Sequence, residues 1–421
     1  MRNKINLALK HPLISGSSMI FIGGLVASFF NFIFNLFMAR TLLPSDYGIL
    51  ISIMSLLALC SLPAGAVIPL VINFAASYFA KKEISKVEDL FFKVLKFSSL
   101  LGLFVFIVFF IFHTKIAQFF RINNESLILL TGFMVFLGYI GVVNNALLQA
   151  KLSFKFITFS NLLGAFLKLA FGIGFVFLGF SVGGVIWGFL FASFIPYLVS
   201  FIPLKFIFSG KRKNSKTKIG TLLAYGAPAA ITVFCLTSLS TIDLILVKHF
   251  FDPTVAGIYA GMATVGKVIF FFSAPIGTVM FPLIVQKNAK GENFHNIFKL
   301  SLLLVFIASV FITVFYFIYP EFTVKFFLKK EAYLSIAPLL GLFGIFITFY
   351  SLLSIIVNFY LSTKKTNVFI PIVLGAISQA ALIWFFHSSF LQIISISIST
   401  TGLLVFALLL YYWRMYDKEK K

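Results

Sequence analysis

Three ionisable side chains lie inside long apolar stretches of this sequence, namely Lys168, Lys267 and Asp243. A charged group near the middle of a bilayer costs roughly 2.5–3.5 kcal/mol on insertion scales, so it usually faces a cavity, a partner or a ligand. Buried ammonium groups can neutralise phosphates that leave water, and a buried carboxylate can pair with an ammonium or hold a coupling cation. Two buried cations against one anion favour an anionic ligand.

Uncharged amide side chains recur at helical spacing in the same stretches. They form two i, i+4 pairs and one further position: Asn31 and Asn35, Asn145 and Gln149, and Asn161. Asn161 shares a helical face with Lys168, because seven residues make nearly two turns. Two basic residues, Arg40 and Lys248, follow the first and the seventh apolar stretch. We predict that these polar residues line a wet interior, with Arg40 and Lys248 at its outer rim.

Each of these residues also has a structural interpretation. Lys168 could extend to the membrane interface or bind a helix carbonyl, and Asp243 could pair with Lys267 or Lys248 instead of holding an ion. Asn and Gln in membrane helices also join helices through hydrogen bonds. The five histidines and two cysteines are scattered, and no nucleotide-binding loop is present, so we predict no metal site and no cofactor.

The composition indicates which elements must position these residues. Of the 421 residues, 60% are hydrophobic and 11% are charged, whereas a soluble domain is about half apolar and a quarter charged. A spanning helix needs roughly 20 mostly apolar residues. About twelve such runs lie near 15–38, 48–79, 94–112, 127–149, 157–178, 182–204, 221–247, 255–285, 297–319, 335–360, 368–386 and 390–412. We therefore predict an all-α integral membrane protein.

The net charge of +22 is distributed unevenly along the chain. If the N-terminus is cytoplasmic, 25 of the 34 Lys and Arg residues lie on the cytoplasmic side, seven lie outside and two lie within spans. Because the acidic residues divide almost evenly, this bias follows the positive-inside rule. We predict a multi-pass protein with both termini in the cytoplasm. The basic cluster at 211–218 is interpreted as a topology determinant near anionic lipid, so no nucleic-acid partner is expected.

Two segments about 210 residues apart share a pattern. Residues 39–49 and 247–258 each contain a basic residue, a hydrophobic pair, a Pro and a Gly four positions after it. A second match pairs Pro63, Gly65, Val67 and Pro69 with Pro275, Gly277, Val279 and Pro282. Parallel repeats of six spans are a transporter architecture. We predict two parallel six-helix lobes, 1–210 and 211–421, around a central cavity.

These junctions resemble a known family, the polysaccharide flippases of the Wzx type in the multidrug/oligosaccharidyl-lipid/polysaccharide exporter superfamily. The residues that carry the resemblance are the 40–48 stretch and the series Asp243, Lys248, Pro253, Gly257 and Tyr259. The resemblance implies alternating access and an undecaprenyl-diphosphate-linked oligosaccharide as cargo, flipped from the inner to the outer leaflet of the bacterial inner membrane. It also implies a role in O-antigen or capsule biosynthesis, with the polysaccharide polymerase and chain-length machinery as partners.

Three other functions agree less well with the residues. Peptidoglycan-precursor flippases of this superfamily usually have fourteen spans, against about twelve here. A multidrug exporter of the same superfamily would usually have an acidic or aromatic pocket for cationic drugs, whereas a diphosphate requires buried cations. A membrane-embedded synthesis enzyme needs paired carboxylates, a metal site or a donor-binding loop, and the sequence has none of these patterns. We predict a transporter, not an enzyme.

Overall fold

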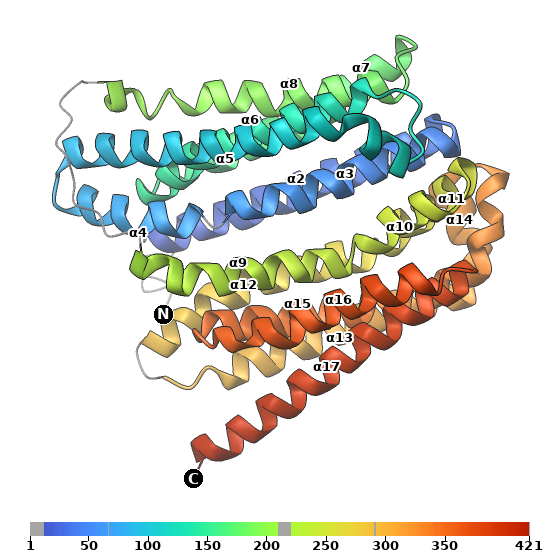
Figure 1. The fold of residues 1–421 in the computed structure, drawn as a ribbon. Coiled ribbons are helices and arrows are strands. Elements are labelled where there is room, and N and C mark those ends of the chain that lie inside the picture. Colours follow the sequence, from blue (N-terminus) through green and yellow to red (C-terminus); the bar gives the residue numbers. More distant parts are fainter. Residues whose placement is uncertain (1–11, 66, 209–219, 290–291, 421) are drawn as a thin grey trace. The chain divides into compact units, whose positions relative to one another are not determined.

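The computed structural model describes residues 12–65, 67–208, 220–289 and 292–420, and the regular elements among them are all helices (Figure 1). The α-helices are α2 Pro12–Thr41, α3 Pro44–Gly65, α4 Val67–Ala80, α5 Ile84–Phe119, α6 Ser126–Ala150, α7 Phe154–Phe177, α8 Val182–Ser200, α9 Gly220–Leu239, α10 Ile242–Phe250, α11 Pro253–Gly266, α12 Val268–Ala289, α13 His295–Ile318, α14 Pro320–Leu328, α15 Ala337–Ser362, α16 Phe369–Phe385 and α17 Phe390–Lys420. Three short 3₁₀ helices are η1 Lys205–Phe208, η2 Glu331–Ile336 and η3 Thr366–Val368. The prediction of an all-α protein is confirmed. The basic cluster at 211–218 lies outside the described residues.

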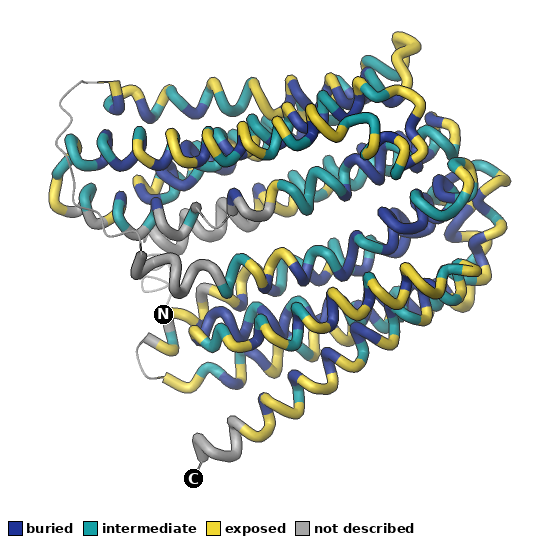
Figure 2. Tube along the Cα trace, in the orientation of Figure 1, coloured by how far each residue is buried: buried dark blue, intermediate teal, exposed yellow. Residues whose placement is uncertain are grey.

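The number of apolar helices agrees with the predicted number of spans. Within the described residues, 11 helices are long and apolar enough to cross a membrane, and the number rises to 12 when α9 and α10 count as one bent span. Large apolar side chains also stay exposed along these helices, such as Phe311 at 75% and Leu403 at 69%. Figure 2 shows many exposed positions on α13 and α17. Because soluble monomers rarely expose so much apolar surface, these faces are suited to lipid.

The chain forms two compact units. The first holds Met1–Phe34 and Cys60–Ala227, and the second holds Asn35–Leu59 and Pro228–Lys421. The end of α2 and most of α3 therefore belong with the C-terminal part of the chain. The division into lobes at residue 210 stays a prediction, since these units follow contacts and not the sequence repeat.

In the first unit, small residues allow long helices to pack closely. Helices α5 and α6 pack along each other, as do α7 and α8, and α4 lies on α6. A Cβ atom at Gly102 of α5 would lie 2.9 Å from Tyr139 of α6, and one at Gly132 would lie 2.6 Å from Phe109. Lipid tails are as apolar as the helix surfaces, so the hydrophobic effect does not drive membrane helices together. Close approach at small residues instead provides van der Waals contact between them.

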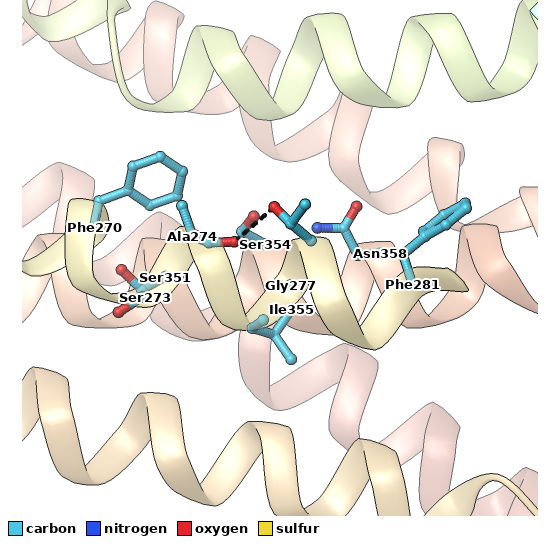
Figure 3. Close-up of a pocket in the computed structure, with 10 residues that line it drawn as sticks. Phe270, Ser273, Ala274, Gly277, Phe281, Ser351, Ser354, Ile355 and Asn358 are labelled. Atoms are coloured by element: carbon cyan, nitrogen blue, oxygen red, sulfur yellow. Dashed lines mark hydrogen bonds between the residues drawn. The ribbon is translucent and has the colours of Figure 1, made fainter. Parts of the chain in front are cut away.

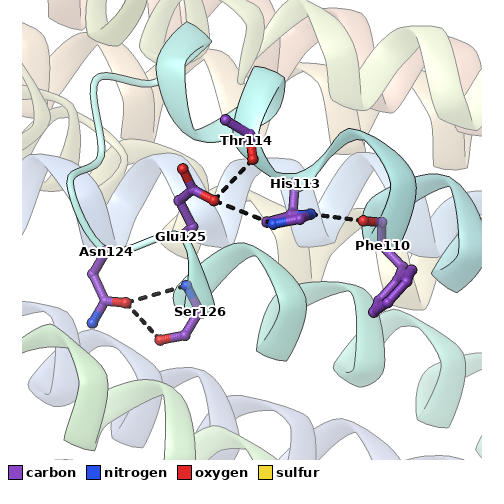
Figure 4. A network of polar contacts seen from close by, with 6 residues as sticks. All are labelled: Phe110, His113, Thr114, Asn124, Glu125 and Ser126. Atoms are coloured by element: carbon purple, nitrogen blue, oxygen red, sulfur yellow. Dashed lines mark hydrogen bonds and ion pairs between the residues drawn. The ribbon is translucent and has the colours of Figure 1, made fainter.

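The turn between α5 and α6 is closed by a polar network (Figure 4). The Nε2 atom of His113 lies 3.2 Å from a Glu125 carboxylate oxygen, and the Thr114 hydroxyl donates to the same oxygen at 2.9 Å. The Asn124 side-chain oxygen accepts from the Ser126 backbone N–H and hydroxyl. These bonds satisfy backbone and side-chain groups where the chain reverses between two spans, so the network has a local structural role.

In the second unit, α15 is the central helix. The span Glu331–Ser362 contains α15. In its apolar stretch of 18 residues, 78% of the residues are buried, against 22–44% in the corresponding stretches of the other candidate spans. Helices α11, α12, α13 and α17 pack around α15, which Figure 2 shows largely in the colour of buried residues. The Tyr360 hydroxyl donates to the Leu408 carbonyl of α17 at 2.9 Å and so links the two helices.

Two glycines that the sequence repeat matched lie against each other in this unit. A Cβ atom on Gly48, in the first turns of α3, would lie 2.9 Å from the Cα atom of Gly257 in α11. The backbones of α3 and α11 touch at this point, which requires the absence of side chains on both. The second match of the repeat cannot be compared in the same way. The side chains of Pro63, Pro69 and Pro282 lie outside the described residues.

Candidate functional site

Lys267 lies at the junction of α11 and α12 in the second unit. The Lys267 N–H donates to the Ala263 carbonyl at 2.9 Å, and the Phe271 N–H donates to the Lys267 carbonyl at 3.1 Å. The helical hydrogen bonds therefore continue through the junction, and α11 and α12 present Lys267 as one continuous helix would. Lys267 therefore lies within the stretch 255–285 that is predicted as the eighth span, and its place midway through the membrane stays a prediction.

Lys267 lines a cavity of about 180 Å³, which we call the Lys267 cavity. Its walls come from α2, α3, the α9–α10 turn, α10, α11 and α12, all within the second unit. Its polar lining consists of Asn35, Ser55, Thr241, Thr264 and Lys267. Two of the predicted residues, Lys267 and Asn35, are thus brought together from opposite halves of the sequence.

Asn35 and Thr264 differ in how their polar atoms are satisfied. The Asn35 side-chain oxygen is buried and has no hydrogen-bond partner among the described residues. The Thr264 hydroxyl instead bonds the Tyr47 hydroxyl and donates to the Ala260 carbonyl. A buried carbonyl oxygen without a donor costs about 1–3 kcal/mol, so the Asn35 amide is suited to accept a hydrogen bond from a ligand or a water molecule.

Asp243 lies in the first turn of α10, directly after a break that the sequence did not predict. Helix α9 ends at Leu239 and α10 begins at Ile242, with a bend of 47°. The hydroxyls of Ser240 and Thr241 both donate back to the Thr237 carbonyl. Such bonds compete with the helical ladder and bend helices, and the Ser and Thr residues at 237–241 are the signal that could have located the break.

The Asp243 side chain is fully buried and has its own hydroxyl partner. The Tyr259 hydroxyl donates to Asp243 Oδ2 at 2.8 Å, and both side chains are 0% exposed. Asp243 also interacts electrostatically with Lys267, although the two described side chains form no direct ion pair. Tyr259 therefore holds one oxygen of the carboxylate, and Lys267 is the residue of the two charged ones that lines the cavity.

Arg40 and Lys248 do not line the Lys267 cavity, and their place at an outer rim stays a prediction. Arg40 donates from Nε to the Phe327 carbonyl at 2.7 Å and from Nη2 to the Phe326 carbonyl at 2.6 Å. The guanidinium thereby caps the C-terminus of α14, where the helix dipole favours a cation. Lys330 binds the Leu42 carbonyl in return, and burial lowers the pKa of its ammonium. Lys248 is 1% exposed within α10 and does not line the Lys267 cavity.

We expect Arg40→Ala to lower the free energy of unfolding by about 2–3 kcal/mol, because it removes two hydrogen bonds from a charged donor. Thermal unfolding of the purified protein in detergent measures this change. Lys325→Ala on α14 is the matched control, because its ion pair with Glu321 at 3.5 Å is exposed and should contribute little. An unfolding midpoint of Arg40→Ala equal to that of the wild type would contradict the capping role.

In the first unit, Lys168 is satisfied by protein groups. Its ammonium donates to the Asn31 side-chain oxygen at 3.0 Å and lies 4.6 Å and 4.7 Å from the ring centroids of Phe34 and Phe189. Asn31 in turn donates to the Ala27 carbonyl. The predicted Asn31–Asn35 pair is therefore divided between the two units, with Asn31 holding Lys168 and Asn35 lining the Lys267 cavity. These contacts favour the structural interpretation of Lys168.

Two of the three remaining predicted amides line a cavity of about 140 Å³ in the first unit. Asn145 of α6 and Asn161 of α7 both line it, together with Ser193 and Tyr197 of α8. Gln149 donates to the Asn145 side-chain oxygen at 3.1 Å, so the i, i+4 pair is formed. No group of three or more metal-ligating side chains occurs in the part of the chain that the structure describes.

The comparisons with known proteins agree with this arrangement. A profile of the family described as "polysaccharide biosynthesis protein" matches residues 37–338, which include both junctions and the whole Lys267 cavity except Asn35. The chain belongs to this polysaccharide biosynthesis family. No curated protein matches the sequence. The resemblance inferred from the two junctions is confirmed at the level of the polysaccharide biosynthesis family.

Solved structures show which fold this family member has. An inward-facing multidrug resistance MATE transporter of the MOP superfamily is similar with a TM-score of 0.73 at 13% identity, covering 94% of this chain and 96% of that one. The lipid II flippase MurJ in an inward closed conformation has a TM-score of 0.70 at 17% identity, covering 92% and 87%. The MATE multidrug transporter DinF-BH has a TM-score of 0.65 at 15% identity, covering 97% and 96%. The fold is therefore that of MATE and MurJ proteins, and these neighbours are transporters and a flippase.

Proposed function

We propose that this protein flips an undecaprenyl-diphosphate-linked oligosaccharide from the inner to the outer leaflet of the bacterial inner membrane, by alternating access. The oligosaccharide would be a repeat unit for O-antigen or capsule, so the polysaccharide polymerase and the chain-length machinery would act on the flipped product. The observation that carries the proposal is that Lys267 lines a cavity among apolar helices of a chain that belongs to the polysaccharide biosynthesis family.

The chemistry of the cavity supports an anionic cargo over a cationic drug. Lys267 is the one ionisable residue in the cavity lining within the described residues, and Asp243, which accepts a hydrogen bond from Tyr259, does not belong to that lining. A diphosphate that enters the bilayer must exchange its hydration for cations and hydrogen-bond donors. Lys267 supplies the cation, and the hydroxyls of Ser55 and Thr241 supply further polar groups in the same wall.

Deletion of the gene tests the proposal. We expect lipid-linked oligosaccharide to accumulate in the inner leaflet, surface polysaccharide to disappear, and both to return to normal when the wild-type gene is restored. Susceptibility to cationic drugs should stay unchanged in the deletion strain. If the deletion strain keeps its surface polysaccharide but becomes sensitive to drugs, the proposal is wrong and the alternative function, a multidrug exporter, is supported.

The proposed topology places both termini and the 205–220 stretch in the cytoplasm and the stretch near 320–335 outside. In a background without Cys60 and Cys235, we expect Asn214→Cys to react with a membrane-impermeant maleimide only in inverted vesicles, and Ala332→Cys to react in intact spheroplasts. The reason is the bias of basic residues toward one side. Labelling of Asn214→Cys from the outside would reverse the assignment of every loop.

A further inference from the structure

The second unit, which contains the Lys267 cavity, also contains a cavity of different chemical character. It has a volume of about 420 Å³ and lies between α12 and α15 (Figure 3). We call it the Ser351 cavity. Its polar lining consists of Ser273, Thr278, Ser351, Ser354 and Asn358. None of the described residues that line it is ionisable, so it is suited to a neutral ligand that forms hydrogen bonds.

The hydroxyls that line this cavity differ in whether they have a hydrogen-bond partner within the protein. Ser273 donates to the Ile269 carbonyl at 2.9 Å and contacts the Ser309 hydroxyl at 3.2 Å, and Thr278 donates to the Ala274 carbonyl. The Ser351 hydroxyl is different, since the residue is 1% exposed and its oxygen has no hydrogen-bond partner in the described part of the chain. An unpaired buried hydroxyl is costly, so the Ser351 oxygen is suited to a hydrogen bond with a ligand in this cavity.

The cavity also has apolar walls, which can contact the apolar face of a ligand. Phe270 and Phe281 lie toward its two ends in Figure 3, and Asn358 projects from α15 opposite Gly277 of α12. A Cβ atom at Gly277 would lie 3.3 Å from the Asn358 amide nitrogen, so the glycine keeps this part open. Apolar walls with a few convergent hydrogen-bonding groups are typical of sites for small organic ligands. A sugar ring has both the hydroxyls and the apolar faces that such walls require.

Helix α12 connects this cavity to the Lys267 cavity. Lys267 and Phe271 line the Lys267 cavity, and Ala274 and Thr278 line the Ser351 cavity. The four residues follow at helical spacings of four, three and four and therefore lie on one face. Thr278 is eleven residues beyond Lys267, about 16 Å along the helix at 1.5 Å per residue. One elongated molecule can reach both cavities along this face.

We propose that the Ser351 cavity binds uncharged sugar of the lipid-linked oligosaccharide while the diphosphate is bound at Lys267. This inference rests on the proposed function, and it names the part of the cargo that each cavity recognises. Ser351 and Asn358 provide hydrogen bonds to sugar hydroxyls, and Lys267 neutralises the phosphates. The site therefore distinguishes the glycosylated lipid from the same lipid without sugar.

The experiment measures binding of two probes to the full chain in lipid nanodiscs. One probe is polyprenyl diphosphate that carries a short uncharged oligosaccharide, and the other is bare polyprenyl diphosphate. We expect Ser351→Ala and Asn358→Leu each to weaken binding of the glycosylated probe about tenfold and to leave the bare probe unchanged. Lys267→Ala should weaken both probes. Ser351→Ala removes no hydrogen bond within the described protein, so poor folding would not explain its loss of binding.

Ser309→Ala is the matched control, because Ser309 contacts Ser273 of the cavity lining but is not itself a lining residue. It should bind both probes as the wild type does. Equal losses for both probes in Ser351→Ala and Asn358→Leu, or no loss for either, would overturn the sugar subsite and leave the proposed function standing if Lys267→Ala still weakens both. A wild-type protein that binds neither probe would overturn both proposals.

Discussion

Gly257→Ala is expected to abolish accumulation of the folded protein. A Cβ atom at this position would overlap the carbonyl carbon and oxygen of Pro44, at the start of α3. These are backbone atoms, so no side-chain rotation can relieve the overlap, and α3 and α11 would have to move apart. Overpacking of a buried site costs about 1–3 kcal/mol even where side chains can adjust, and more is expected where they cannot.

Membrane abundance and the thermal unfolding midpoint in detergent measure this effect. Gly48→Ala should be less severe, because its Cβ atom would lie 2.9 Å from backbone atoms of Gly257 and a small shift of α3 suffices. Gly174→Ala is the control in α7, since a Cβ atom there meets nothing within 4 Å and alanine favours the helix. A Gly257→Ala protein with wild-type abundance and midpoint would show that α3 and α11 do not touch at this point.

The second large effect is expected at Lys267. Lys267→Ala should reduce export of the lipid-linked oligosaccharide more than about tenfold at normal protein abundance, whereas Lys267→Arg should keep part of the activity. The reason is that a cation, and not a particular side-chain shape, neutralises the diphosphate. Transport by the reconstituted protein, normalised to its amount in the vesicles, gives the measurement.

A structural pair with Asp243 makes the opposite prediction. In that case Lys267→Ala should lower abundance, and adding Asp243→Ala should restore function. The Tyr259–Asp243 hydrogen bond of 2.8 Å argues against this outcome, because the carboxylate keeps a partner after Lys267 is removed. Lys168→Ala is the matched control. Its ammonium is held by Asn31, so we expect lower stability and less effect on transport per folded molecule. Full export by a well-expressed Lys267→Ala protein would remove the cation hypothesis.

Hydropathy predicted the helices well because it depends on local composition. Each of the twelve predicted runs corresponds to a helix or to a pair of adjacent helices within the described residues. Two features were missed. The break between Leu239 and Ile242 depends on hydroxyls that bond carbonyls within the helix, and an average over an apolar window does not register them. Helix α14 lies between the predicted runs 297–319 and 335–360, because its nine residues are too few to span a membrane.

The candidate site was only partly predictable, because the partner of each polar residue depends on packing between distant segments. The cost of burying charge singled out both Lys267 and Lys168, yet the first lines a cavity and the second is held by Asn31. Arg40 was assigned to a cavity rim, whereas its guanidinium binds carbonyls 286 and 287 residues away in α14. Asn358 and Ser351 were not singled out at all, since single Ser and Asn residues in an apolar helix are common and gain meaning only from a facing helix.

The division of α2 and α3 between two units has a consequence for how the protein is made. The segment Asn35–Leu59 leaves the ribosome early, but the rest of its unit begins only at Pro228, after the 168 residues of Cys60–Ala227. At a synthesis rate of about 5–20 residues per second, the segment waits roughly 8–34 s before any of these later residues exists. During that time the backbone of Gly48 and the guanidinium of Arg40 lack the surfaces that they finally contact. The first unit can therefore be completed during translation, whereas the second closes only after its last helices enter the membrane.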